Sequence, residues 1–168
     1  GLVMGDVSGD TNRCGRTRLD GRCRYEQVFL VMRKLRLSME EIEEMYRRMI
    51  FNIMARNHDD HAKNIAFLMD RAGRWSLSPA YDLTFAYNPT GTWTQTHQLT
   101  VAGKRDGFEW EDLKECARAA SLKRGRAEAI VGEVRQVVER WPDYADDAGV
   151  RPEHRDHISK VLHLAPLA

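Results

Sequence analysis

The clearest pattern of hydrophobic and polar positions lies between residues 38 and 54. Ser38 is a suitable N-cap, and Glu41 three residues later completes a capping box. Apolar side chains then recur at helical spacing and predict one buried helix face, made of Ile42, Met45, Tyr46, Met49, Ile50, Ile53 and Met54. The methionines on this face indicate core packing. Because the helix runs directly into a polar segment, we expect it to act as a rigid support for that segment.

Other segments also show helical periodicity. They are Tyr25–Leu35, Glu111–Ser121, Arg126–Trp141 and Glu153–Leu164. The third carries an apolar face made of Ala127, Ile130, Val131, Val134, Val137, Val138 and Trp141. Pro142 is expected to end that helix, because proline cannot continue one.

A β-hairpin is predicted directly after the polar segment. Apolar residues 65–69 and 75–77 flank a turn at 70–73, and Pro79 is expected to end the second strand. The hairpin would then bring Asp82 back toward the polar segment. Residues 86–96 suggest a flexible loop, and the alternation over 97–101 suggests another short strand. The fold class predicted is therefore mainly α, with one small β-hairpin.

Composition agrees with one soluble domain. The chain has 168 residues, of which 42% are hydrophobic and 30% charged. Its net charge of +1 provides no general attraction to nucleic acid or membranes. No signal peptide or membrane-length apolar run is visible, and three scattered cysteines predict a reducing, cytoplasmic setting. Residues 1–20 are rich in Gly and Arg, so we expect an irregular, solvated arm before a domain at 21–168.

The polar segment, residues 57–64, is dense in chemically active groups. It reads Asn-His-Asp-Asp-His-Ala-Lys-Asn, which is two carboxylates, two imidazoles, one ammonium and two amides. Asp59 and Asn64 stand five positions apart, as do the Asp and Asn of the kinase catalytic loop. Asp82 follows eighteen residues after Asn64, inside Ser-Pro-Ala-Tyr-Asp-Leu.

These residue types suit phosphoryl transfer. That reaction needs metal ions to neutralise phosphate charge and a carboxylate to orient the attacking hydroxyl and accept its proton. Asp59 fits the carboxylate, and Lys63 fits a group that neutralises phosphate charge. Asn64 and Asp82 offer the oxygen ligands that Mg²⁺ prefers. The roles of His58 and Asp60 stay open.

Together these motifs resemble the C-terminal kinase domain of the HipA family. They are N-x-D-D-H-x-K-N, an apolar hairpin, and then L-S-P-A-Y-D-L at residues 77–83. HipA proteins are bacterial serine/threonine protein kinases, usually encoded as toxins beside a helix-turn-helix antitoxin. The resemblance covers about residues 25–150 and is weak before residue 19.

The resemblance implies a kinase C-lobe fold and a role for each matching residue. Asp59 is the implied catalytic base, while Asn64 and Asp82 are the implied Mg²⁺ ligands. The implied nucleotide-binding residues are His61, Ala62, Lys63, Asn64, Tyr81 and Asp82. ATP, Mg²⁺, a protein substrate and a helix-turn-helix antitoxin are implied partners, with no direct contact to nucleic acid or membrane. Asp60 competes for the role of base, but the spacing to Asn64 favours Asp59.

One part of the HipA pattern has no counterpart in the sequence. The ATP-binding lobe of the family carries a glycine-rich phosphate loop and a phosphate-binding lysine. Here Gly5, Gly9 and Gly15 form no G-x-G-x-x-G motif, and Lys34 is the first lysine. We therefore expect the chain to match the C-lobe alone, and a catalytically incomplete fragment that acts as a binding module stays open.

Two other interpretations of the polar segment are weaker. His58-Asp59 with His61 resembles an HD-type metal phosphohydrolase, in which imidazoles and carboxylates hold a transition metal that activates water. Such a site requires an upstream histidine, and none precedes His58. It also leaves Lys63 and Asn64 unexplained. A plain turn, whose Asp and Asn side chains bind the backbone, explains single residues but not the joint pattern.

Overall fold

The computed structural model describes residues 2–3 and 23–164 of the chain. Within these residues the helices are α1 (Tyr25–Lys34), α2 (Met39–Met54), α3 (Trp110–Ala119), α4 (Arg126–Val138), α5 (Trp141–Asp147) and α6 (Pro152–Val161). One 3₁₀ turn, η1, spans Ala62–Asn64. The strands are β1 (Leu2–Val3), β2 (Ala66–Met69) and β3 (Trp75–Leu77). The predicted fold class, mainly α with a small hairpin, is confirmed.

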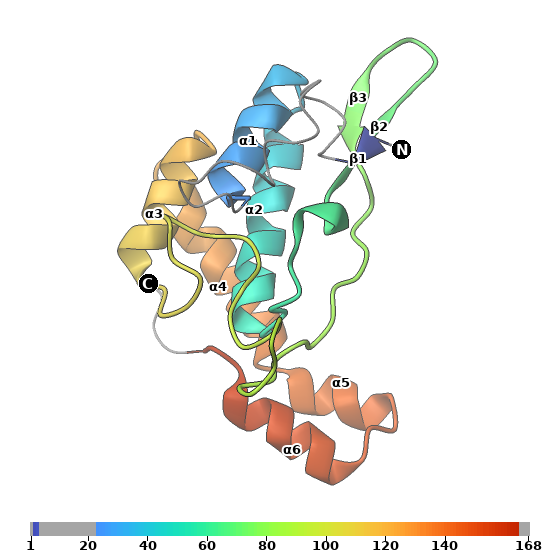
Figure 1. Ribbon diagram of the computed structural model, residues 1–168, viewed down its shortest axis with the longest axis vertical. Helices are drawn as coiled ribbons and strands as arrows, with labels where there is room; N and C mark the ends of the chain where they lie inside the picture. The colour runs from blue at the N-terminus through green and yellow to red at the C-terminus, as the bar shows by residue number, and fades with distance from the viewer. Residues whose placement is uncertain (1, 4–22, 165–168) are drawn as a thin grey trace.

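Helix α2 stands at the centre of the molecule (Figure 1). Helices α1, α3 and α4 lie on one side of it, and the sheet lies on the other. All seven residues of its predicted apolar face are buried. The predicted capping box is also present, because Ser38 Oγ accepts from Glu41 N and Glu41 Oε2 accepts from Ser38 N. The helix thus has the buried position that its periodicity predicted.

The hairpin forms where the sequence predicted it. Strands β1, β2 and β3 pair antiparallel in that order, with Phe67 opposite Leu77. Leu77 N donates to Glu41 Oε1 at 2.8 Å, so β3 is tied to the first turn of α2. β1 lies within the segment that we expected to be irregular, and residues 4–20 of that segment lie outside the described residues.

The strand predicted over residues 97–101 is wrong. That stretch makes only isolated bridges, from Thr100 to Arg24 and from Val101 to Lys104. The backbone N–H groups of Gln98 and Leu99 instead donate to the carboxylate of Asp60. A distant side chain therefore takes the hydrogen bonds that a strand partner would have used.

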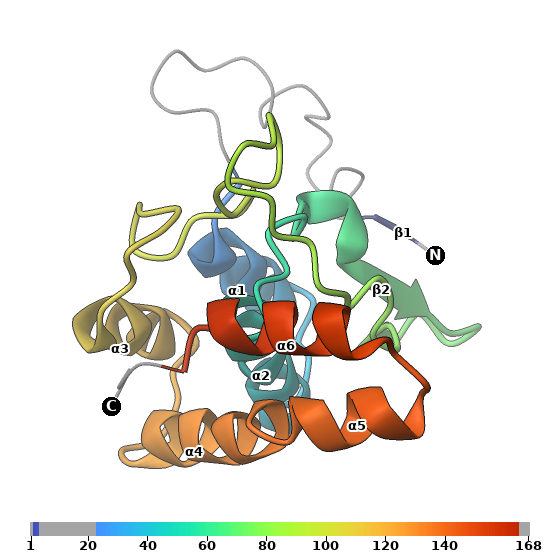
Figure 2. The same cartoon turned by 90° about the horizontal axis from the view of Figure 1, so that it is seen from below.

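The helix predicted over residues 126–141 is two helices. α4 ends at Val138, and Trp141 begins α5, which the sequence did not predict. Pro142 lies in the first turn of α5, where its missing N–H costs no hydrogen bond, so it begins a helix instead of ending one. Val137, expected on the buried face, is 51% exposed. Helices α5 and α6 lie side by side beyond the C-terminal end of α2 (Figure 2).

Two observations concern the setting of the protein. Among the described helices, none has the length and apolar character needed to cross a bilayer. Cys116 is a buried free thiol, whereas Cys23 is disulfide-bonded.

Candidate active site

The polar segment begins just after α2 ends, and its first residues contact Ala86, which follows Asp82 in the chain. Asn57 N donates to Asn52 O at 2.9 Å as the helix closes. His58 N then donates to Ala86 O, and Ala86 N donates to Arg56 O. These bonds align residues 56–58 with Ala86 over a short parallel bridge. The loop that carries Asp82 is thereby docked along the polar segment.

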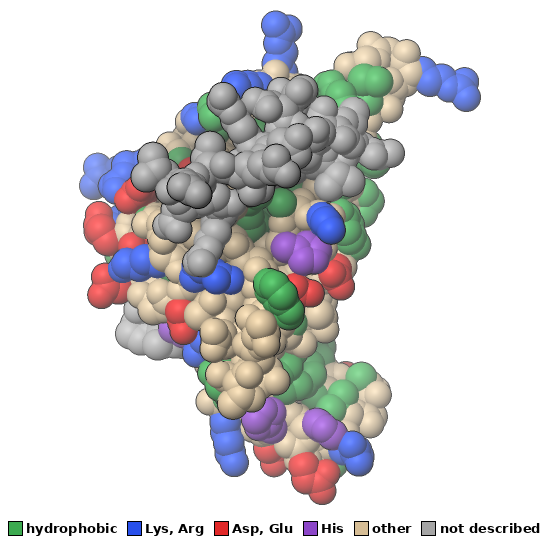
Figure 3. Space-filling model, in the orientation of Figure 1, with side chains coloured by type: hydrophobic (Ala, Val, Ile, Leu, Met, Phe, Trp, Pro, Cys, Tyr) green, Lys and Arg blue, Asp and Glu red, His purple; other side chains and the backbone are tan. Residues whose placement is uncertain are grey.

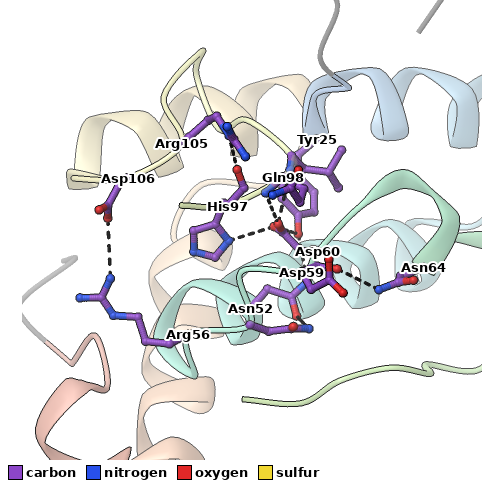
Figure 4. A network of polar contacts seen from close by, with 12 residues as sticks. Tyr25, Asn52, Arg56, Asp59, Asp60, Asn64, His97, Gln98, Arg105 and Asp106 are labelled. Carbon is purple, nitrogen blue, oxygen red and sulfur yellow. Dashed lines mark hydrogen bonds and ion pairs between the residues drawn. The ribbon is translucent and has the colours of Figure 1, made fainter. Parts of the chain in front are cut away.

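Asn64 joins Asp59 and Asp82 in one place. Its Nδ2 donates to the backbone oxygen of Asp59 at 3.0 Å and to Asp82 Oδ2 at 2.9 Å, and Figure 4 shows the contact with Asp59. Because Nδ2 makes both bonds, Asn64 Oδ1 is left as an acceptor. Within the described residues, neither Asn64 Oδ1 nor Asp82 Oδ1 accepts a hydrogen bond. The three residues predicted as base and metal ligands thus come together.

These oxygens fit a magnesium ion. Mg²⁺ in phosphate-transfer sites takes one or two protein ligands and fills its octahedron with phosphate oxygens and water. Asn64 and Asp82 offer one amide oxygen and one carboxylate, on two side chains that are hydrogen-bonded to each other. A transition-metal site is less well supported, because no cluster of three or more His, Cys, Asp or Glu side chains suits a metal in the part of the chain that the structure describes.

The loop before Asp82 is held against η1. Tyr81 OH donates to Lys63 O at 2.6 Å. Burial and the neighbouring Asp82 charge raise the pKa of Tyr81, so this hydroxyl stays a donor at neutral pH. The Lys63 side chain itself is exposed. In the view of Figure 3, His, acidic and basic side chains gather toward the right at mid-height.

The predicted nucleotide-binding residues divide between two hollows. His61, Ala62 and Lys63 line a hollow of about 630 Å³. Asn64, Tyr81 and Asp82, again with His61, line a cavity of about 20 Å³. The larger hollow has the size of a small-molecule site, whereas the smaller one has room for about one water molecule. His61 is the predicted nucleotide-binding residue that lines both, and Leu99 also lines both.

Asp60 is a buried, fully bonded carboxylate. It is 2% exposed and accepts from four groups, of which Figure 4 draws several: Tyr25 OH at 2.9 Å, His97 Nδ1 at 3.0 Å, Gln98 N at 2.8 Å and Leu99 N at 3.3 Å. Burial, and then the charge of Asp60, raises the pKa of Tyr25 well above its usual value, so the Tyr25 hydroxyl remains protonated. Both carboxylate oxygens of Asp60 thus take part in hydrogen bonds inside the fold.

Asp59 differs from Asp60 in both burial and hydrogen bonding. Its side chain is half-buried, and its carboxylate makes no hydrogen bond to another described residue. A carboxylate in this state is available to accept a hydrogen bond from a substrate hydroxyl. The geometry thus favours Asp59 over Asp60 as a base, in agreement with the spacing to Asn64.

His58 turns into the core. It is 0% exposed, and its ring lies 4.9 Å from that of Tyr87 and 4.2 Å from that of His97, measured between centroids. Burial, followed by the charges of His97 and Arg56, lowers the pKa of His58 to about 4. The imidazole is therefore neutral at pH 7 and faces away from solvent, so it does not meet Asp59 in an HD-type metal site.

Sequence reasoning missed several residues that hold this site. Tyr25, Asn52 and His97 received no role, although each lies in the hydrogen-bond network around Asp60 or Asn57. Asn57 was part of the motif without a role of its own. Asn57 carried a signal as part of the motif, whereas His97 carried none, because it lies 37 positions from Asp60 and no local pattern links them.

Comparisons with known proteins agree with this architecture. The family model described as HipA-like C-terminal domain matches residues 11–141. A similar solved chain comes from the "Shewanella oneidensis MR-1 Toxin Antitoxin System HipA, HipB and its operator DNA complex", with a TM-score of 0.68 and 19% identity. The match covers 89% of this chain and 37% of that one, so this chain spans little more than a third of its relative. At this identity the likeness shows the fold. A comparison with curated proteins finds no match.

Proposed function

Because this chain belongs to the HipA-like C-terminal domain family, we propose that it supplies the catalytic and metal-binding half of an ATP- and Mg²⁺-dependent protein serine/threonine kinase. One observation carries the proposal. The amide of Asn64 joins the backbone of Asp59 to the carboxylate of Asp82, although the two aspartates lie far apart in the sequence.

Each residue has a role that its surroundings allow. Asp59, whose carboxylate is unbonded within the described residues, accepts the proton of the attacking Ser or Thr hydroxyl. Asn64 Oδ1 and the Asp82 carboxylate would hold Mg²⁺, which would neutralise the phosphate charge. Lys63 is exposed and precedes Asn64 in the chain, and it adds a positive charge for the same phosphates. His61 and Ala62 line the hollow next to Lys63, and Tyr81 holds the Asp82 loop through its bond to Lys63 O.

The proposed partners follow from the family and from the solved relative. HipA in that structure is assembled with HipB and operator DNA. We extend this to a protein antitoxin for the present chain, with any contact to DNA made through that partner. The substrate is a Ser or Thr of another protein, and we place the reaction in the cytoplasm, where ATP is supplied.

The test measures MgATP binding by calorimetry and γ-phosphate transfer to a Ser/Thr protein substrate or to the chain itself. Asp82→Asn should remove Mg²⁺-dependent binding. Asp59→Asn should keep that binding but lower transfer at least about a hundredfold, as expected for loss of a positioned base. Asp147→Asn, at an exposed position on α5, is the matched control and should behave like the original chain.

The outcomes separate the proposal from its rivals. Undiminished transfer by Asp59→Asn or Asp82→Asn would refute the roles given to those residues. Failure of the unaltered chain to bind MgATP would instead show that the chain is catalytically incomplete by itself, as the alternative of a fragment that acts as a binding module requires.

A further inference from the structure

We propose that Asn57 and Asn52 are positioning residues that hold the backbone of Asp82, so that its carboxylate faces Asn64. Neither asparagine is expected to contact metal, nucleotide or substrate. The importance of Asp82 for catalysis rests on the proposed function, whereas the anchoring itself is a property of the fold.

Asp82 needs an external anchor. Its φ is +55°, in the left-handed region that is unfavourable for residues other than glycine, although Asp tolerates it better than most. The residue is also exposed, so packing does not hold it. Strained backbone of this kind persists only where surrounding contacts determine it.

Asn57 supplies that anchor. Its Nδ2 donates to the backbone oxygen of Asp82 at 3.1 Å, the only hydrogen bond to the Asp82 backbone within the described residues. The second Nδ2 hydrogen goes to Asn52 Oδ1 at 3.0 Å. Asn57 is 1% exposed, so these bonds form away from competing water.

The anchor is itself fixed by a chain of bonds that all point the same way. Asn57 donates to Asn52, whose Nδ2 donates to Tyr25 OH at 3.0 Å, and Tyr25 OH donates to Asp60 Oδ2 at 2.9 Å. The chain ends on a carboxylate, and aligned hydrogen bonds strengthen one another in a low dielectric. This chain of hydrogen bonds connects the Asp82 backbone to Asp60, which is itself hydrogen-bonded to residues 97–99.

This arrangement requires an amide at position 57. Two donors on one atom satisfy Asn52 Oδ1 and Asp82 O together. A carboxylate of the same shape would set an acceptor against each of those oxygens. Aspartate is therefore expected to be as damaging as alanine at this position, although it keeps the volume of the side chain.

The experiment compares the unaltered chain with Asn57→Ala and Tyr25→Phe. Tyr25→Phe keeps the ring in the core and removes only the hydroxyl, so it tests the relay if Asn57→Ala fails to fold. Asn88→Ala is the control, because the Asn88 side chain bonds only locally, to Thr90. Hydrogen–deuterium exchange of peptides covering residues 80–86 reports the anchoring, and Mn²⁺ and Mg²⁺ titrations, with and without ATP, report the metal ligands.

We expect Asn57→Ala to speed exchange at residues 80–86 and to weaken apparent metal affinity about 10- to 100-fold, as do other outer contacts of metal ligands. Tyr25→Phe should give a smaller change in the same direction. Unchanged exchange in folded Asn57→Ala, or in Tyr25→Phe if the first variant does not fold, would overturn the inference. Faster exchange together with no metal binding by the unaltered chain would support the anchoring and count against the proposed function alone.

Discussion

Asp59 and Asp60 are adjacent in the chain, yet their surroundings give them different chemistry. Asp60 accepts four hydrogen bonds in the core, from Tyr25, His97 and two backbone amides. Asp59 is half-buried beside Asn64, and its carboxylate accepts no hydrogen bond from the part of the chain that the structure describes. Since a hydrogen bond to a charged group contributes more to stability than a neutral one, Asp60 is expected to stabilise the fold, whereas Asp59 is the carboxylate that the proposed reaction requires.

The same substitution should therefore lower the stability at Asp60 much more than at Asp59. Asp60→Asn places an amide where four donors converge, so we expect the free energy of unfolding to fall by about 3 kcal/mol. Asp59→Asn should change it by less than about 0.5 kcal/mol, as at other positions without such partners. Urea unfolding followed by circular dichroism measures both. Equal stabilities for the two variants would contradict this division of roles.

Among the elements, α2 carries the site. Its N-terminal capping box shares Glu41 with β3, and its last turn leads into the polar segment. Burial alone would raise the pKa of Glu41, but the N–H groups of Leu77 and Ser38 outweigh it and lower that pKa. The hairpin and the polar segment are thus both attached to α2, one at each end of this buried helix. Displacing α2 would separate Asn64 from Asp82.

A charge on the buried face of α2 should unfold the domain. Met45 is 2% exposed and Ile50 is 0% exposed, so Met45→Asp or Ile50→Asp buries an unpaired carboxylate. We expect a loss above about 3 kcal/mol, seen as loss of cooperative thermal unfolding. Val137→Asp is the matched control, because that apolar helical position is 51% exposed. A folded Met45→Asp protein with an unchanged melting temperature would show that the packing of α2 is misassigned.

At the scale of the whole molecule, His58 lies where distant segments meet. Tyr87 and His97 pack against its ring, and the charged groups that affect it are Arg56, His97 and Asp106. Burial is the largest influence and lowers the pKa of His58 to about 4 in the folded state. In an unfolded chain the pKa is near 6.5, so the unfolded state binds more protons between these values.

Stability should therefore fall as the pH falls from about 6.5 to about 4. The difference between the two pKa values corresponds to a stabilisation on the order of 3 kcal/mol, which is fully present above about pH 6.5 and lost by about pH 4. His58→Phe keeps a planar ring without the titration, so its stability should decline less over the same window. Urea unfolding at several pH values measures the difference, and parallel curves for the two proteins would contradict it.

The sequence by itself determined the elements whose signals are local. The Ser38 cap, the periodicity of α2 and the turn at residues 70–73 each act within a few residues, because caps and periodic burial depend on near neighbours. The motifs at 57–64 and 77–83 also named the family, which the comparisons confirmed. They also indicated Asp59, Asn64 and Asp82 as candidate site residues.

Only the tertiary structure decided how those residues are held. Hydrogen bonds between Asp60 and residues 97–99 took the place of the predicted strand. Pro142 lies in the first turn of α5, although periodicity predicted a single helix that ended before it. Long-range hydrogen bonds also distinguish Asp60 from Asp59, and another such bond joins Asn57 to the backbone of Asp82. Partners 25 to 39 positions apart meet only after the chain has folded, so no local pattern in the sequence contains them.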